Sequence, residues 1–208
     1  MNAPDGYLTP ATGAQFEYTE KKSVFIAALR PVGSEEEARA FIEEKKKEHP
    51  DARHNVWAYR LKDGAMRCAD DGEPAGTGGA PVLESIKKRD LYGCVIVVTR
   101  YFGGILLGTG GLVRAYSFAA SGALDLAGRA KVSVYLRASV TAEYGQYGTL
   151  TRLMTKYEAR DPVPSFGENV KVTFLLPKER FESFERELTE AFSGRLGVDR
   201  MEEVPVKN

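Results

Sequence analysis

The residues best suited to chemistry lie in two glycine-rich blocks. The first spans residues 70–79 (DDGEPAGTGG) and the second spans residues 100–111 (RYFGGILLGTGG). Together they hold nine of the 21 glycines of the chain. Glycine loses more backbone freedom on folding than any other residue, so such density is expected where the chain turns at positive φ or where a ligand approaches the backbone closely. A ligand surface and plain loop geometry are therefore the two interpretations of these blocks.

The second block has the features of an anion site. Residues Gly108–Gly111 lead directly into a predicted helix, and the unpaired N–H groups at a helix start attract negative charge. Arg100 and Arg114 flank this opening, and a guanidinium binds phosphate with two parallel hydrogen bonds. Neither the lysine of a phosphate-binding P-loop nor the glycine spacing of a dinucleotide fingerprint is present. The pattern thus indicates a bound anion rather than a particular reaction.

Aromatic residues beside these glycines add a second possibility. Tyr101 and Phe102 would stack on nucleic-acid bases if they were exposed, and otherwise they belong to the core. The candidate anion- or nucleic-acid-binding residues are Arg100, Tyr101, Phe102, Gly103, Gly104, Gly108, Thr109, Gly110, Gly111 and Arg114.

Acidic residues and one histidine are the remaining candidates for chemistry. Asp70, Asp71 and Glu73 match the preference of Mg²⁺ for oxygen ligands, although acidic residues beside glycine are also ordinary turn formers. His54 could act as a base in a cleft or serve as a polar loop residue, and no nucleophile motif accompanies it. The chain has only two histidines, which excludes a multi-histidine metal site. We expect no cofactor, with Mg²⁺ as the single candidate.

Composition describes an ordinary globular protein. The 208 residues include 29 Lys and Arg against 29 Asp and Glu, so no strongly basic surface for nucleic acid is indicated. The two cysteines, Cys68 and Cys94, form no disulfide framework or zinc motif. No apolar run approaches the ~20 residues that cross a bilayer, and residues 1–12 contain no signal-peptide core. We expect a cytoplasmic protein with no membrane contact.

The elements that must position the two blocks follow from local patterns. We predict strands over residues 22–32, 55–61, 65–69 and 94–98, and helices from Ser34 to Pro50 and over residues 81–88 and 111–127. Ser34 and Glu37 fit a capping box, and the continuous apolar run 94–98 indicates a strand that is buried on both faces. The apolar or small positions of the last helix are Leu112, Ala115, Tyr116, Ala119, Ala123 and Leu126.

After Gly128 the pattern changes. Alternation over residues 131–141, a helix around 147–157, strands near 159–165 and 170–176, a helix over 181–192 and a strand over 195–206 follow in turn. This β-α-β-β-α-β order is the ferredoxin-like plan. We therefore predict an α+β protein with two domains, residues 1–133 and 134–208, whose boundary lies between Gly128 and Val134.

A set of motifs in the N-terminal half comprises Gly79-Ala80-Pro81-Val82-Leu83, Ile86, Leu91, Val97-Val98, Arg100-Tyr101-Phe102-Gly103-Gly104, Leu107, Gly108 and Gly110–Tyr116, with Asp70–Pro74, His54-Asn55 and Ala58-Tyr59. These positions resemble the motifs of the IMPACT family, which is also called uncharacterised protein family 0029. The C-terminal segment resembles the ferredoxin-like domain of bacterial members, which is similar to a domain of elongation factor G.

The resemblance implies a fold and a range of functions. It implies an N-terminal α/β sandwich of the ribosomal protein S5 domain 2 type and, because eukaryotic relatives regulate translation, a role in translation regulation or stress. Our first hypothesis is a non-catalytic binder of RNA or of ribosome-associated factors. A Mg²⁺-assisted phosphate-ester or nucleotide hydrolase and a protein-interaction regulator without nucleic-acid contact are the alternatives. A basic groove that joins Arg100 and Arg114 would favour RNA, clustered carboxylates the hydrolase, and an exposed apolar patch the protein partner.

Overall fold

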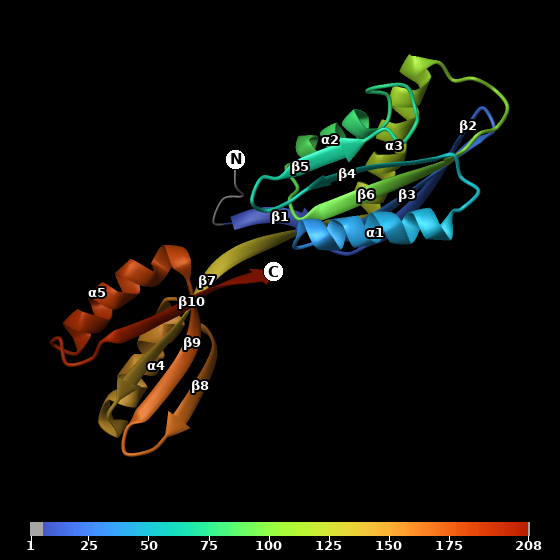
Figure 1. Ribbon diagram of the computed structural model, residues 1–208. Helices are drawn as coiled ribbons and strands as arrows, with labels where there is room; N and C mark the ends of the chain where they lie inside the picture. Colours follow the sequence, from blue (N-terminus) through green and yellow to red (C-terminus); the bar gives the residue numbers. More distant parts are fainter. Residues whose placement is uncertain (1–5, 208) are drawn as a thin grey trace. The chain divides into compact units, whose positions relative to one another are not determined.

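The computed structural model describes residues 6–207 and confirms the α+β class (Figure 1). The chain divides into two compact units, Met1–Lys131 and Val132–Asn208. The division lies inside strand β7 (Arg129–Ala142), so a continuous strand rather than a loop joins the two units. Each unit has its own hydrophobic core.

The first unit is built on a five-stranded sheet with the strand order β2-β3-β6-β4-β5, in which all neighbours are antiparallel. Its elements are β1 (Gly6–Pro10), β2 (Ala14–Glu20), β3 (Ser23–Pro31), α1 (Glu35–Glu48), β4 (His54–Arg60), β5 (Met66–Ala69), α2 (Gly79–Lys88), β6 (Cys94–Tyr101) and α3 (Thr109–Ala127).

Helices cover both faces of this sheet (Figure 1). Helices α2 and α3 pack on one face against alternate side chains such as Phe25, Val56 and Ile96. Helix α1 packs on the other face through Phe41 and Ile42. The central strand β6 is therefore apolar on both sides, as its continuous run of hydrophobic residues predicts.

Local signals place the helix ends. The Ser34 hydroxyl accepts a hydrogen bond from the Glu37 amide and caps α1 as predicted (3.2 Å). The Glu37 carboxylate bonds to the Gly33 amide (2.7 Å) rather than to that of Ser34, so the capping box is displaced by one residue. In α3 the expectation for Leu126 is wrong. Its side chain is 62% exposed, and Leu124 is buried in its place.

Strands β1 and β2 are not among the predicted elements. In β2, Phe16 and Tyr18 alternate with exposed polar residues and pack beside the N-terminal core. This alternation is a strand signal, but it lies in a short, polar and proline-flanked segment. β2 pairs with β3 through a two-residue turn, with Glu20 opposite Ser23.

The second unit has the predicted β-α-β-β-α-β order. After β7 come α4 (Tyr144–Lys156), β8 (Arg160–Phe166), β9 (Val170–Pro177), α5 (Phe181–Ala191) and β10 (Val198–Lys207). Its strands lie in the order β10-β7-β9-β8 with antiparallel neighbours. Leu150 and Leu153 of α4 and Phe184 and Leu188 of α5 share one core with alternate residues of β7 and β9. Within residues 6–207, no helix is both long and apolar enough to cross a membrane.

Candidate functional site

Both glycine-rich blocks and the start of β4 line one cleft of about 410 Å³ in the first unit. Six of the residues selected from the sequence meet there, although they come from three separate segments of the chain. The lining residues are Arg53, His54, Gly72, Glu73, Pro74, Arg100, Phe102, Leu106, Leu107, Gly108, Thr109 and Leu112.

The register of the sheet brings these segments together. Strands β4 and β6 are neighbours, and His54 at the start of β4 lies opposite Arg100 near the end of β6. The first block follows β5 and the second follows β6, so both connections leave the sheet at the same end. The cleft lies between these connections and the first turn of α3.

A buried ion pair forms the base of the cleft. The Arg100 Nη1 atom lies 2.7 Å from Oε1 of Glu73, and both side chains are almost completely buried. The Tyr116 hydroxyl donates a second hydrogen bond to the same Glu73 oxygen (2.6 Å). Burial and this bond to a carboxylate raise the pKa of Tyr116 far above its usual range. Glu73 therefore joins the first block to β6 and α3.

This pairing changes the role of Arg100. Its charge is balanced by Glu73, and its Nη2 atom lies 3.5 Å from the Ser23 hydroxyl. The Nε atom is buried and has no hydrogen-bond partner. Arg114 is exposed and lines a different pocket. The two arginines therefore do not share the groove that the sequence suggests for an anion.

In the first block, Asp70 holds the loop together. Its carboxylate accepts hydrogen bonds from the amides of Gly76, Gly78 and Gly79, at 2.8 to 3.0 Å. Partial burial opposes ionisation of the carboxyl, but these three donors outweigh it and lower the pKa of Asp70. Gly78 and Gly79 lie at the start of α2, so Asp70 accepts hydrogen bonds from amides that have no acceptor within that helix.

Asp71 and His54 form a second set of internal bonds. The Asp71 carboxylate accepts from the Asn55 amide (2.6 Å), and its backbone carbonyl lies 2.9 Å from Nδ1 of His54. A carbonyl can only accept, so Nδ1 of His54 carries a proton and Nε2 is the remaining acceptor of the neutral ring. Asp71 and Gly72 both have positive φ, which shapes this turn.

Asp70, Asp71 and Glu73 thus have different partners. Among residues 6–207, no group of three His, Cys, Asp or Glu side chains is arranged to hold a metal ion. Asp70 and Asp71 are bonded to backbone amides, and Glu73 is bonded to the side chains of Arg100 and Tyr116.

The second block differs from the first, in which glycine amides donate hydrogen bonds to Asp70. Gly108 precedes α3 at a φ of 71°, and no side chain caps this helix. The Leu112 amide bonds to the Gly108 carbonyl (2.9 Å), so the three preceding amides, those of Thr109, Gly110 and Gly111, have no acceptor within the helix. Gly104 also has positive φ and lies in open space. Gly103 differs, because it packs directly on the peptide between Lys22 and Ser23 and leaves no room for a side chain.

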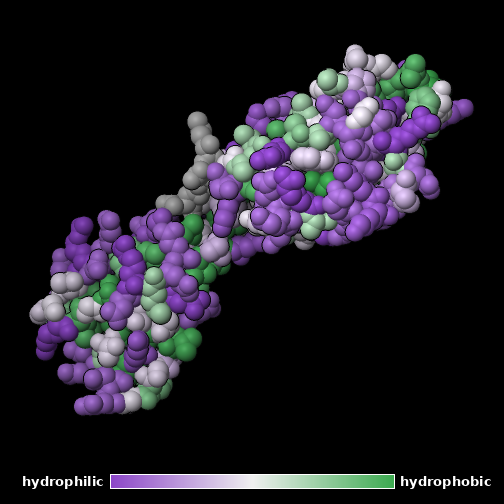
Figure 2. All heavy atoms as spheres, viewed as in Figure 1, coloured by the Kyte–Doolittle hydropathy of each residue, from purple (hydrophilic) through white to green (hydrophobic). Residues whose placement is uncertain are grey.

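Exposed apolar side chains lie on the connection that leads into α3, and two of them, Phe102 and Leu106, line the cleft. Phe102 is 47% exposed, Ile105 is 43% exposed and Leu106 is 83% exposed, and all three lie on the connection from β6 to α3. Figure 2 shows apolar atoms at the end of the first unit where Figure 1 places this connection. We call Phe102, Ile105 and Leu106 the apolar rim.

Other residues selected from the sequence do not line the cleft, and some lining residues were not selected. The eight selected residues outside the lining are Asp70, Asp71, Tyr101, Gly103, Gly104, Gly110, Gly111 and Arg114. Tyr101 is not among the lining residues, and its hydroxyl lies 2.9 Å from Nδ1 of His49 at the end of α1. Arg53 lines the cleft, is exposed and forms no ion pair with any described residue. The position of Arg53 beside His54 was the sequence signal that could have identified it. Leu107 had only its match to the family motif, and Leu106 had no signal, since apolar residues in a glycine-rich segment are typical of packing.

Both units match known protein domains. The Impact N-terminal domain model matches residues 21–124, and a domain of unknown function (DUF1949) matches residues 140–195. An IMPACT family member of Haemophilus influenzae is 40% identical over 201 residues, which cover 94% of this chain and 97% of that protein. The chain belongs to the IMPACT family.

Other IMPACT family members agree over most of their length. YvyE of Bacillus subtilis is 35% identical, covering 92% of this chain and 89% of that protein, and YigZ of Escherichia coli is 32% identical, covering 96% and 100%. A crystal structure described as that of a hypothetical protein aligns with a TM-score of 0.64 at 32% identity, covering 95% of this chain and 98% of that one. All residues that line the cleft lie within the segment matched by the Impact N-terminal domain.

Proposed function

We propose that this IMPACT family protein is a non-catalytic binding protein of the cytoplasm, whose N-terminal unit docks a protein of the translation machinery. The observation that carries the proposal is the apolar rim, which leaves Leu106 83% exposed beside a cleft of about 410 Å³. Exposed apolar side chains grouped around a cleft are typical of a protein-binding surface. The resemblance to translation regulators directs the search for the partner.

The charges near the rim define the chemistry of that partner. Arg53 lines the cleft and forms no ion pair with any residue that the structure describes, and the N-terminus of α3 adds partial positive charge. Glu73 and Arg100 neutralise one another below. An apolar side chain of the partner in the cleft, with an acidic residue next to it, would satisfy both features. Because Arg100 is paired with Glu73, fewer cations are available at the cleft for contacts with RNA phosphates.

The state of the potential nucleophiles supports binding rather than catalysis. Burial raises the pKa of the Cys94 thiol to about 12, and burial together with the charge of Asp70 raises that of Cys68. A thiol attacks as its thiolate, so neither cysteine is activated. His54 has an Nε2 acceptor at the cleft, but no hydroxyl or thiol nucleophile is hydrogen-bonded to it in the described part of the chain.

The experiment is co-sedimentation of the purified protein with purified ribosomes, and with ribosomal RNA alone, at two salt concentrations. Leu106→Asp places a charge on the rim at a position where almost no packing is lost. Leu126→Asp is the matched control, because Leu126 is 62% exposed and does not line the cleft. We expect Leu106→Asp to weaken binding about tenfold or more, in the range of an interface hot spot, and Leu126→Asp to leave it unchanged.

Two other results would replace the proposal. Equal binding of ribosomal RNA and ribosomes, with a steep loss as salt rises, would favour nucleic acid as the partner. In that case Phe102, Arg53 and the α3 N-terminus would hold a base and its phosphate. Equal binding by the Leu106→Asp protein and the wild type would remove the rim from the contact.

A further inference from the structure

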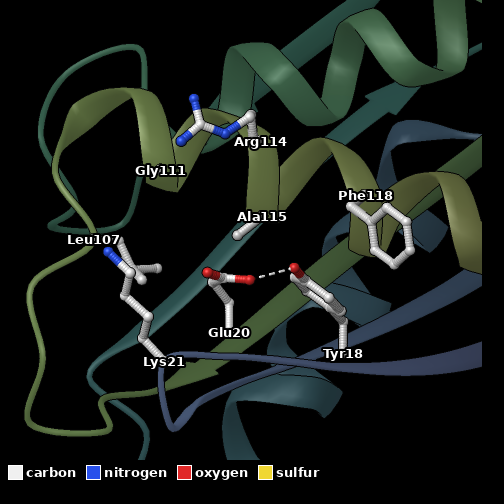
Figure 3. Close-up of a pocket in the computed structure, with 8 residues that line it drawn as sticks. All are labelled: Tyr18, Glu20, Lys21, Leu107, Gly111, Arg114, Ala115 and Phe118. Carbon is white, nitrogen blue, oxygen red and sulfur yellow. Dashed lines mark hydrogen bonds between the residues drawn. The ribbon is translucent and has the colours of Figure 1, made fainter.

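A second pocket lies on the other side of the segment that leads into α3. It has a volume of about 280 Å³ and is lined by the end of β2, by Leu107 and by one face of α3. Figure 3 shows the charged side chains of Glu20, Lys21 and Arg114 at this pocket, with the Glu20 carboxylate between the side chains of Lys21 and Tyr18 and with Arg114 above them. This pocket is separate from the cleft and shares only Leu107 with it.

These charges are not neutralised by one another. The Glu20 carboxylate accepts a hydrogen bond from the Tyr18 hydroxyl (2.6 Å), and this bond raises the pKa of Tyr18. In the part of the chain that the structure describes, Lys21 and Arg114 form no ion pair. The pocket thus presents one carboxylate and two cations within a small volume.

The backbone fixes the position of Lys21. Lys21 and Lys22 are the two residues of the β2–β3 turn, with φ values of 45° and 64°. Positive φ at both positions is the geometry of a type I′ turn, in which Asn-Gly is the preferred pair. The turn is held from outside, because Gly103 packs on the Lys22–Ser23 peptide and its amide bonds to the Ser23 hydroxyl (3.1 Å).

The rest of the pocket is apolar. The rings of Tyr18 and Phe118 lie 4.5 Å apart between their centroids, and Leu107 and Ala115 complete the lining. Phe118 is 53% exposed, although it belongs to the group of large apolar side chains that proteins usually cover. Figure 3 shows its ring beside Tyr18, on the opposite side of the pocket from Lys21.

We infer that this pocket binds a small zwitterion of the α-amino acid class with an apolar side chain. Glu20 would accept hydrogen bonds from the ammonium group, and Lys21 and Arg114 would hold the carboxylate. The aromatic pair and Leu107 would cover the side chain. A simple anion would be repelled by Glu20 and a simple cation by Lys21 and Arg114, so the ligand class that satisfies all three carries both charges.

The test is a titration of the ¹⁵N-labelled full chain, followed by NMR, with three probes. L-leucine carries both charges, N-acetyl-L-leucine lacks the ammonium group, and L-leucinamide lacks the carboxylate. We expect L-leucine to shift the amides of Lys21, Gly111 and Arg114, and both derivatives to bind at least about tenfold more weakly, as for the loss of a hydrogen bond to a charged group.

Variants of Glu20 and Arg114 test which charged group of the ligand each side chain binds. Glu20→Gln should weaken binding of L-leucine about tenfold. It should not weaken binding of N-acetyl-L-leucine, because that probe has no ammonium group and its carboxylate is no longer repelled. Glu17→Gln is the matched control, since Glu17 is exposed on the same strand and does not line the pocket. Arg114→Lys keeps the charge and should retain binding if Arg114→Gln loses it.

Two results would overturn the inference. The first is the absence of any shift with L-leucine up to about 10 mM, a range in which even weak complexes register. The second is equal affinity for L-leucine and N-acetyl-L-leucine, which would make the pocket a site for anions only. An unchanged spectrum away from the pocket in the Glu20→Gln protein shows that this variant is folded.

Discussion

The two glycine-rich blocks have similar composition and opposite roles. In the first block, Asp70 accepts from three glycine amides and Glu73 is buried against Arg100, so its polar groups are used inside the protein. In the second block, α3 begins without a side-chain cap and the apolar rim faces solvent. Glycine density by itself therefore does not show whether the backbone N–H groups of a loop are bonded within the protein or left open.

The Glu73 carboxylate of the first block, which is buried against Arg100 of the second, gives the strongest test of this contrast. Glu73→Ala leaves Arg100 charged and buried without a partner and removes the acceptor of Tyr116, so we expect it to lower the free energy of unfolding by about 3–5 kcal/mol. Urea unfolding followed by the fluorescence of Trp57, the single tryptophan, reports on this unit. Glu84→Ala on the exposed face of α2 is the control. Equal effects of the two changes would contradict a structural role for the first block.

Gly103 of the second block is closely packed, so we expect a substitution there to affect stability. A side chain at Gly103 would overlap the Lys22–Ser23 peptide, so we expect Gly103→Ala to destabilise the unit by about 1–3 kcal/mol, the usual cost of overpacking. Gly110→Ala is the matched control on the first turn of α3, where only the end of the Arg114 side chain is near. The same urea experiment measures both. A neutral Gly103→Ala would mean that this contact is not maintained in solution.

Asp70 adds a pH dependence to the first block. Its pKa is lowered in the folded protein, so its contribution to stability is present above its ordinary pKa of about 3.9 and is lost as the pH falls through the folded value. We expect Asp70→Asn to cost about 1–2 kcal/mol at neutral pH, as for the loss of a helix cap. The difference from wild type should shrink below about pH 3.9. Unfolding curves at several pH values test this, and a constant difference would contradict it.

The smallest expected effect is a gain in stability, and it comes from a substitution in the second block. Thr109→Asp places a negative charge on the first turn of α3, where the amides are open, and should stabilise the unit by about 0.3–1 kcal/mol. Thr109→Asn lacks the charge and is the control. Thermal unfolding resolves a change of this size. A loss of stability in Thr109→Asp would show that the start of α3 is already satisfied and that the two blocks do not differ.

Local patterns were sufficient for most elements. The helices around Ser34 and Pro81 and the buried strand that starts at Cys94 begin where capping, turn and apolar signals place them. These features depend on residues within a few positions of one another. β2 was missed because its alternation is short, and Leu126 was assigned to the core because the helical period alone does not say how far the sheet extends beneath α3.

For the candidate site, too, local sequence predicted one part and tertiary contacts decided the rest. The sequence by itself determined which residue types gather near the two blocks and that α3 begins at glycines. Only the tertiary structure decided that Arg100 is paired with Glu73, 27 positions away, and that Arg114 lies with Glu20 and Lys21 in another pocket. These contacts join residues far apart in the chain. Sheet register and side-chain burial set them, and neither is fixed by the residues nearby in sequence.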